Sequence, residues 1–477
     1  MLPISLNSLL PFITIPIFTR ILTPEDYGVL AMAMIYAIFM SGLANFGLSY
    51  GFERNYFQYR DNPEKLAQLL FSSLGFILTN FVLLIGITYL FKENISTFLT
   101  ATTQHGNLML TAFAGHFFYS TTTNFYFTYF KNAEKAKTHS KYNIASNILN
   151  LIISLILVVY MRAGIIGVVM AQLITGVSLF LFLLYLSLKE LRFSLNKNIL
   201  LESLKISYPL TPRIFISIID TQFDKYMIGL LATVNGVGVY HIGKKISELI
   251  FTFMSAIENV FNPQVYQHMF GQHEQSSNAI GKYLTPFLYI SISLALCIGF
   301  FSEELITILT PVSYHGAIPI VTILSMYFGF LFFGKIVGMQ LIYSKKTHIT
   351  SLLTLLSVGL NVVLNIPLIM KYGPVGAAWA TMLAGLISGT ISLVVAQHYY
   401  RVNYEWEKIV WIMGTFFVGA TAISSMNFLN SPYLWSLPIK ITVIGIFIKL
   451  GIRYNILTME NYKEIKYILN TRKLSDV

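Results

Sequence analysis

Apolar stretches long enough to cross a membrane recur along the whole chain, and short polar segments separate them. A helix needs about 20 apolar residues to cross about 30 Å of hydrocarbon. A spanning segment must satisfy its own backbone hydrogen bonds in lipid, so stretches of this length predict helices. We expect fourteen spans, at residues 2–20, 28–51, 66–91, 108–129, 142–161, 164–187, 206–231, 238–261, 283–301, 318–342, 349–370, 374–398, 409–426 and 433–450.

The seventh span is unusual because it carries the charged residues Arg213, Asp220, Asp224 and Lys225. At about 100° per residue, the first three of these share one helix face. A charge at the bilayer centre costs roughly 2.5 to 3.5 kcal/mol, so this face should line protein or water and not lipid. We therefore expect a polar cavity within the membrane. The alternative is an inert pair between Arg213 and Asp220, with the other two charges at the membrane surface.

The composition supports an integral membrane protein. Hydrophobic residues make up 55% of the chain and charged residues 11%, with a mean hydropathy of +0.65, whereas soluble proteins are about 25% charged. Cys297 is the single cysteine, which excludes an intrachain disulfide and a cysteine metal site. The nine histidines form no ligand motif. We expect no metal, no cofactor and no catalytic residues.

The net charge of +11 could indicate a nucleic-acid partner, but the placement of the charges indicates membrane topology instead. With the N-terminus placed in the cytoplasm, 22 lysines and arginines fall on the cytoplasmic side, 6 on the other side and 4 within spans. The positive-inside rule favours this orientation, with both termini cytoplasmic. Residues 453–477 alternate charged and apolar positions, which predicts an amphipathic cytoplasmic tail.

An internal repeat relates the two halves of the chain. Gly164 and Gly167 recur as Gly373 and Gly376 after 209 residues, and Gly28 recurs as Gly238 after 210. A repeat of six spans preserves orientation, so the halves should be parallel copies related by an axis along the membrane normal. We expect an all-α membrane protein with six-helix bundles at 1–190 and 191–400, two further helices at 401–452 and a tail at 453–477. The repeat aligns Arg213 near Pro3, so we expect either an earlier start or a trimmed first span; no cleavable signal peptide is expected.

The connection between the first two spans reads Arg-x-Leu-x-Pro-Glu-x-Tyr-Gly, from Arg20 to Gly28. Thr23 should cap the second helix, Pro24 fits its first turn, and Asp26 complements the helix dipole. Further along, eleven residues separate Pro212 from the Asp224-Lys225 pair. Together with fourteen spans in two parallel halves, these motifs resemble the polysaccharide flippases of the MOP superfamily, the Wzx-type transporters of O-antigen and capsule.

The resemblance implies a V-shaped pair of bundles that carries an undecaprenyl-diphosphate-linked oligosaccharide across the bacterial inner membrane by alternating access. It also implies membrane lipid and polysaccharide polymerases as partners. A diphosphate needs cationic partners in a dehydrated site, and carboxylates can hold those cations in place or take up a coupling ion. The candidate substrate-binding residues are Arg54, Arg213, Lys225, Lys244 and Lys335, and the candidate coupling or pairing carboxylates are Asp220, Asp224, Glu248 and Glu258.

Several alternatives stay open at this point. A cation-coupled multidrug exporter of the same superfamily would rely on the carboxylates. A membrane glycosyltransferase or polymerase is disfavoured, because the loops are short and the chain has no Asp-x-Asp pair. A structural scaffold would tolerate loss of the intramembrane charges. Gly238 to Lys245 nearly matches a phosphate-binding loop, but it lacks the final Ser or Thr and a preceding strand.

Overall fold

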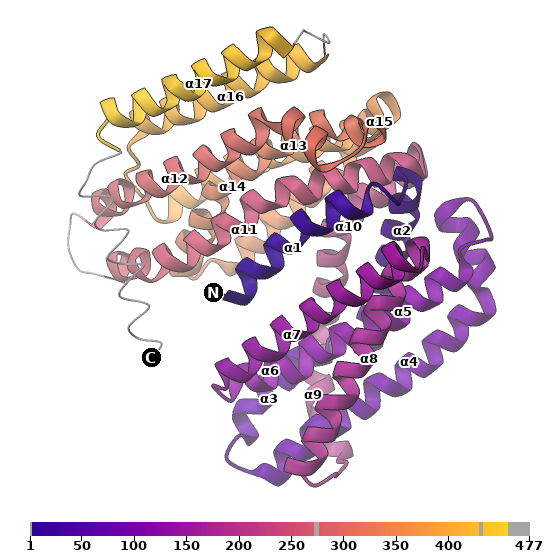
Figure 1. Cartoon of the computed structure of the whole chain (residues 1–477). Helices are drawn as coiled ribbons and strands as arrows, with labels where there is room; N and C mark the ends of the chain where they lie inside the picture. Colours follow the sequence, from indigo (N-terminus) through magenta and orange to yellow (C-terminus); the bar gives the residue numbers. More distant parts are fainter. Residues whose placement is uncertain (1, 271–275, 429–432, 457–477) are drawn as a thin grey trace. The chain divides into compact units, whose positions relative to one another are not determined.

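The structure is a computed structural model that describes residues 2–270, 276–428 and 433–456. All regular elements within these residues are helices, as expected for the all-α class (Figure 1). Contacts divide the chain into two compact units, Met1–His241 and Ile242–Val477, and each is described by itself. The expected amphipathic tail lies outside the described residues beyond Ile456.

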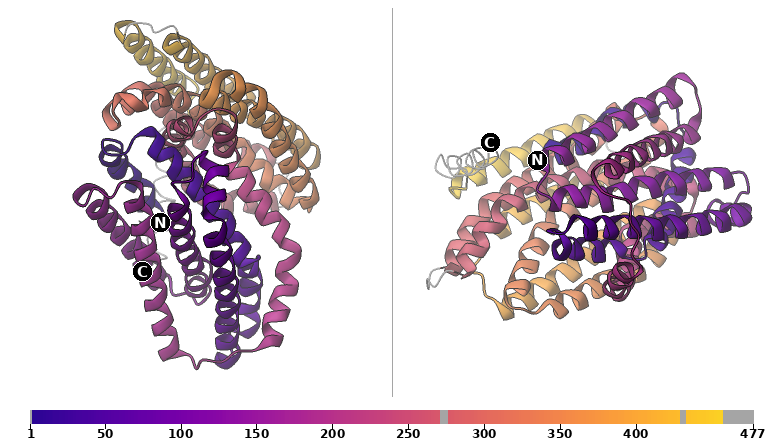
Figure 2. Two further views of the ribbon diagram at one scale, coloured as in Figure 1. Left: turned by 90° about the vertical axis from the view of Figure 1, so that its right-hand side faces the viewer. Right: turned by 90° about the horizontal axis from the view of Figure 1, so that it is seen from below.

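The first unit is a bundle in which α5 packs against α2, α4 and α8, and Figure 2 shows these helices side by side from two further directions. Helix α11 begins here and continues into the second unit. The elements of this unit are α1 (Leu2–Phe18), α2 (Pro24–Asn45), α3 (Leu48–Tyr59), α4 (Pro63–Thr100), α5 (Gly106–Thr121), π-helix η1 (Thr122–Phe127), α6 (Thr128–Asn132), α7 (Ala136–Leu155), π-helix η2 (Ile156–Tyr160), α8 (Gly164–Glu190), α9 (Lys197–Ser207), 3₁₀-helix η3 (Tyr208–Leu210), α10 (Thr211–Leu231) and α11 (Val234–Phe270).

In the second unit α14 packs against α12, α15 and α16, and α17 packs against α16 and α12. Its core includes buried side chains of α14 such as Ile320, Phe332 and Ile336. The further elements of this unit are α12 (Ser276–Phe300), α13 (Ser302–Leu309), 3₁₀-helix η4 (Val312–Ala317), α14 (Ile318–Tyr343), α15 (Thr347–Tyr399), α16 (Trp406–Phe428) and α17 (Tyr433–Arg453).

Each of the fourteen expected spans overlaps a described helix, but several helices exceed the expected bounds. Helix α4 continues to Thr100, but its backbone is non-helical at Phe91, so two helical segments meet at the residue where the expected span ends. Among the described residues, nine helices are long and apolar enough to cross a membrane. The chain is therefore a multi-pass membrane protein. Helices α3, α9 and α13 were not expected.

The start of α2 forms as the sequence predicts. The backbone N–H of Thr23 donates to Asp26 Oδ2 at 2.8 Å, and the backbone N–H of Asp26 donates to Thr23 Oγ1 at 3.2 Å. This capping box satisfies donors that the helix itself cannot, a contribution of about 1 kcal/mol. Pro24 occupies the first turn, where its missing N–H is not needed. The carboxylate of Asp26 therefore has a structural role, as part of the cap of α2.

Two glycines related by the repeat both have a positive φ angle. Gly164, at the start of α8, has a φ of +58°, and Gly373, within α15, has a φ of +57°. Residues with side chains rarely adopt this conformation, whereas glycine does so readily. The backbone at Gly373 is non-helical, so it divides α15 into the two segments that the sequence predicts as separate spans.

A second pair of repeat-related glycines lies where the connections between long helices meet within the first unit. A Cβ added to Gly28 would lie 1.9 Å from the carbonyl oxygen of Val234, and a Cβ added to Gly238 would lie 1.9 Å from the carbonyl oxygen of Pro24. Pro24 and Val234 are themselves separated by 210 residues. The start of α2 and the start of α11 therefore pack on each other through a reciprocal contact that only glycine allows.

Candidate functional site

The polar face of α10 is exposed on the first unit. Ser217, Asp220 and Thr221 are all exposed, and the hydroxyl of Thr221 is bonded to the backbone of its own helix at 3.1 Å. Arg213 lies in α10, but its side chain is outside the described part of the structure. Asp220 therefore belongs to an exposed polar face of α10.

Asp224 has a different environment from Asp220, although both lie on α10. Its side chain is buried, with 3% exposed, and Oδ2 accepts a hydrogen bond from the Tyr240 hydroxyl of α11 at 2.7 Å. A buried carboxylate is costly unless donors satisfy it. The Asp224–Tyr240 bond thus links α10 to α11.

Lys225 is half-buried, and its ammonium donates to Gln222 Oε1 at 3.3 Å on the same helix. Since consecutive residues on a helix differ by about 100° in direction, Lys225 and its neighbour Asp224 point to different surroundings.

Arg54 lies on α3, where it helps to hold the amphipathic helix α9. Its guanidinium is 3.5 Å from Glu202 Oε1 and also donates to Asn55 and Gln58. The Tyr59 hydroxyl donates to the other oxygen of Glu202 at 2.6 Å. Burial, followed by this hydrogen bond and the charge of Glu202, raises the pKa of Tyr59 to about 12. The arginine side chain is still 57% exposed, so it retains a face for a ligand.

In the second unit Lys335 and Glu258 form an ion pair between α14 and α11. Lys335 Nζ lies 2.8 Å from Glu258 Oε2 and 5.1 Å from the centre of the Phe251 ring. The two side chains are 28% and 21% exposed. A carboxylate and an aromatic face both attract a lysine ammonium, so these contacts hold the Lys335 side chain in position. The structure thus brings together two of the residues that the sequence singled out and leaves both partly accessible.

Helix α11 also carries Lys244 and Glu248, which are both half-buried. Glu248 pairs with Lys245, with 3.7 Å between the charged atoms. The polar face of α11 therefore combines a paired carboxylate with the half-buried Lys244.

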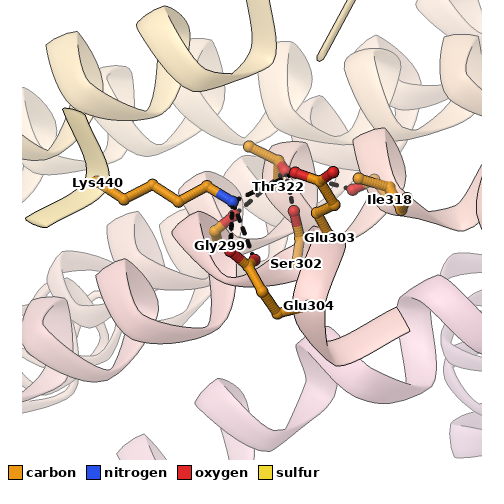
Figure 3. A network of polar contacts seen from close by, with 7 residues as sticks. All are labelled: Gly299, Ser302, Glu303, Glu304, Ile318, Thr322 and Lys440. Carbon is orange, nitrogen blue, oxygen red and sulfur yellow. Dashed lines mark hydrogen bonds and ion pairs between the residues drawn. The ribbon is translucent and has the colours of Figure 1, made fainter. Parts of the chain in front are cut away.

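One buried charged group of the second unit was not predicted. Figure 3 shows Lys440 of α17 reaching two glutamates at the start of α13: its ammonium is 2.8 Å from Glu304 Oε1 and 3.4 Å from Glu303 Oε2. The Lys440 side chain has no exposed area. The available signal was a lysine inside the fourteenth span and a Glu-Glu pair directly after the ninth, but sequence alone gives no reason to bring these two spans together.

The chain matches the family model described as "Polysaccharide biosynthesis protein" over residues 17–319. It is also similar to the "Probable low-salt glycan biosynthesis flippase Agl15" of Haloferax volcanii, with 25% identity over 189 residues. This alignment covers 39% of the chain and 40% of that relative, so the chain spans less than half the length of the curated relative that it matches.

Solved membrane transporters share the fold. The chain is similar to the lipid II flippase MurJ in an inward closed conformation, with a TM-score of 0.61 and 18% identity over 94% of this chain and 99% of the other. It is also similar to an inward-facing multidrug resistance MATE family transporter of the MOP superfamily, with a TM-score of 0.60 and 16% identity over 82% and 94% of the two chains. At these identities the likeness concerns the fold alone, which is shared with the MurJ and MATE transporters.

Proposed function

Because the chain belongs to the polysaccharide biosynthesis protein family, we propose that it is a flippase that moves a polyprenyl-diphosphate-linked oligosaccharide across the bacterial inner membrane by alternating access. The family match is the observation that carries this proposal. The printed name of the Haloferax volcanii relative, a glycan biosynthesis flippase, agrees with it. The relatives are transporters by name, which favours transport over catalysis.

The Lys335–Glu258 pair supports a role in holding the diphosphate. A head group carrying more negative charge than one carboxylate competes with Glu258 for the ammonium of Lys335, which is partly accessible. Glu258, once released, takes up a proton or a cation. This exchange couples binding of the head group to a change of charge in the site. The membrane potential contributes roughly 2.3 kcal/mol per charge per 100 mV to a step that moves a charge across the membrane.

The repeat supports two six-helix bundles, 1–190 and 191–400, as the moving parts, with the further helices at 401–452 attached to the second. In this proposal both termini lie in the cytoplasm, as the lysine and arginine distribution predicts. The reciprocal Gly28 and Gly238 contact then lies at the outer ends of α2 and α11, where the repeats meet. The lipid tail stays in the bilayer while the bundles rock around the head group.

The test is complementation of a strain that lacks its own polysaccharide flippase, with lipid-linked intermediate on the cytoplasmic face as the readout. Wild-type protein should clear the intermediate, Lys335→Gln should leave it to accumulate, and Lys335→Arg should restore part of the activity. Lys371→Gln removes a charge outside the proposed site and serves as the matched control. Full clearance by Lys335→Gln, at equal expression, would exclude the proposed contact.

A cation-coupled multidrug exporter is the second candidate, favoured by the similarity of fold to MATE transporters and by the exposed carboxylate of Asp220. Transport of an organic cation by the purified protein, abolished by Asp220→Asn, would favour it. A glycosyltransferase or polymerase would instead leave the lipid-linked intermediate unmade when the gene is lost. Polysaccharide polymerases are proposed only as partners.

A further inference from the structure

The connection between α15 and α16 encloses a cavity that none of the candidate site residues line. Its volume is about 490 Å³, and its walls come from the end of α15, the connecting segment and the start of α16. The polar and aromatic lining residues are Gln397, His398, Arg401, Asn403, Tyr404 and Trp406, and the apolar wall includes Val394. We call this cavity the Arg401 pocket.

Hydrogen bonds from three helices fix the backbone of the connecting segment. Gln397 of α15 accepts from the N–H of Val402 at 2.9 Å and donates to its carbonyl oxygen at 3.0 Å. Gln340 of α14 donates to the carbonyl oxygen of Tyr400 at 2.8 Å, and Ser277 of α12 donates to that of Arg401 at 2.8 Å. These hydrogen bonds hold the walls of the pocket through backbone atoms of the connecting segment. None of the four uses the side chain of Arg401.

The guanidinium of Arg401 is exposed, and it forms no ion pair with any carboxylate of the described residues. Neighbouring cations are engaged: Lys408 pairs with Glu405 at 2.7 Å, and Lys346 lies 5.5 Å from the centre of the Tyr399 ring. A guanidinium presents a planar fork of donors that matches the oxygens of a phosphate. The positive charge of Arg401 thus favours binding of an anion in this pocket.

The surroundings favour an anion attached to a lipid. The pocket lies between the ends of two helices that are apolar enough to cross a membrane, α15 and α16. Val394 is 66% exposed and Trp406 is 48% exposed, and tryptophan is enriched where membrane meets water. An apolar wall beside a free arginine suits a molecule with a phosphate head and an acyl tail.

We propose that the Arg401 pocket binds the phosphate group of an anionic membrane phospholipid, with Arg401 as the principal contact and Trp406 and Val394 beside the glycerol and the upper acyl chain. This lipid is a resident ligand of the second unit and not the transported cargo, so the proposal does not depend on the proposed function.

The test uses the purified full-length protein in nanodiscs of phosphatidylcholine that contain increasing amounts of phosphatidylglycerol, with bound lipid counted by native mass spectrometry. Wild-type protein should retain phosphatidylglycerol selectively. Arg401→Gln should weaken this binding about tenfold, the effect expected for loss of a charge-assisted hydrogen bond, and Arg401→Lys should weaken it less. Val394→Trp, which fills the pocket but keeps the arginine, should also weaken it.

Lys282→Gln is the matched control, because Lys282 is an exposed cation of the same unit outside the pocket. It should change phosphatidylglycerol binding less than twofold. Equal losses in Lys282→Gln and Arg401→Gln, or no loss in Arg401→Gln and Val394→Trp, would overturn the proposal. In detergent without lipid, inorganic phosphate should bind weakly; phosphate that binds at Arg401 as tightly as phosphatidylglycerol would overturn the assignment to a lipid.

Discussion

Gly28 and Gly238, which are 210 residues apart in the sequence, each face the backbone carbonyl of the residue four positions before the other. A Cβ at either position would lie 1.9 Å from that oxygen, at Val234 and Pro24 respectively. This reciprocity is what the sequence repeat predicts, because equivalent positions in two copies of one segment should make equivalent contacts.

Substitution of either glycine by alanine should therefore push the starts of α2 and α11 apart. Overpacking typically costs 1 to 3 kcal/mol, so we expect Gly28→Ala and Gly238→Ala each to lower the free energy of unfolding by about 2 kcal/mol. Thermal unfolding of the purified protein measures this. Gly86→Ala in α4 is the control, because nothing lies within 4 Å of its added Cβ. Equal melting temperatures for all three variants would contradict the close packing.

Removal of Lys440 should destabilise the second unit more than removal of an exposed lysine. Removing one partner of a buried ion pair lowers the free energy of unfolding by roughly 3 to 5 kcal/mol. Because Glu303 and Glu304 are partly exposed, we expect a loss near the lower limit for Lys440→Met, at about 3 kcal/mol. Lys245→Met removes an exposed pair and should cost less than about 1 kcal/mol.

The double variant Lys440→Met with Glu304→Gln distinguishes electrostatics from packing. It removes the uncompensated carboxylate, so it should recover part of the stability lost in Lys440→Met. The melting temperatures of all three variants are measured by thermal unfolding, followed by far-ultraviolet circular dichroism of the helices. A double variant no more stable than Lys440→Met alone would contradict the prediction that the unpaired carboxylate causes the loss.

Two aspartates of α10 should behave differently when they are neutralised. Asp224→Asn weakens the hydrogen bond with Tyr240 inside the α10–α11 contact, so it should lower the free energy of unfolding by about 1 to 3 kcal/mol. Asp220→Asn changes an exposed residue and should leave the melting temperature unchanged while it reduces transport severalfold. The comparison needs both thermal unfolding and a transport assay. Full transport by Asp220→Asn would remove this carboxylate from the site.

The Tyr59–Glu202 contact predicts a pH dependence for the packing of α9 on α3. The pKa of Tyr59 rises from 10.0 to about 12, through burial and the neighbouring Glu202. A raised pKa means that the folded state holds the proton more tightly, so this contribution to stability is complete below pH 10 and is lost as the pH rises through about 12. The ultraviolet absorbance of tyrosinate can be titrated in the wild type and in Tyr59→Phe. The difference between the two titration curves should show one tyrosine with a pKa near 12. A difference curve centred near 10 would mean that Tyr59 is not held by Glu202.

The sequence was sufficient for the membrane class, the helix at each expected span and the capping box at Thr23, because these follow from local hydropathy and local hydrogen bonding. The repeat predicted that Gly164 and Gly373 have equivalent positions, and the two have nearly equal positive φ angles. The contact of Lys440 with Glu304 was not predictable, because it depends on which helices pack together. Similarly, a helical wheel places Asp220 and Asp224 on one face of α10, but in the structure Asp220 is exposed and Asp224 is buried.

Reconstitution tests the central claim most directly. The purified protein is placed in proteoliposomes with a polyprenyl-diphosphate oligosaccharide, and a membrane-impermeant glycan-modifying reagent reports which leaflet holds the head group. The account predicts that head groups become accessible from the opposite side at a rate well above that of protein-free liposomes, and that Lys335→Gln slows this rate at least severalfold. Head groups that stay on their original side with wild-type protein, under an imposed membrane potential and cation gradient, would contradict the assignment as a flippase.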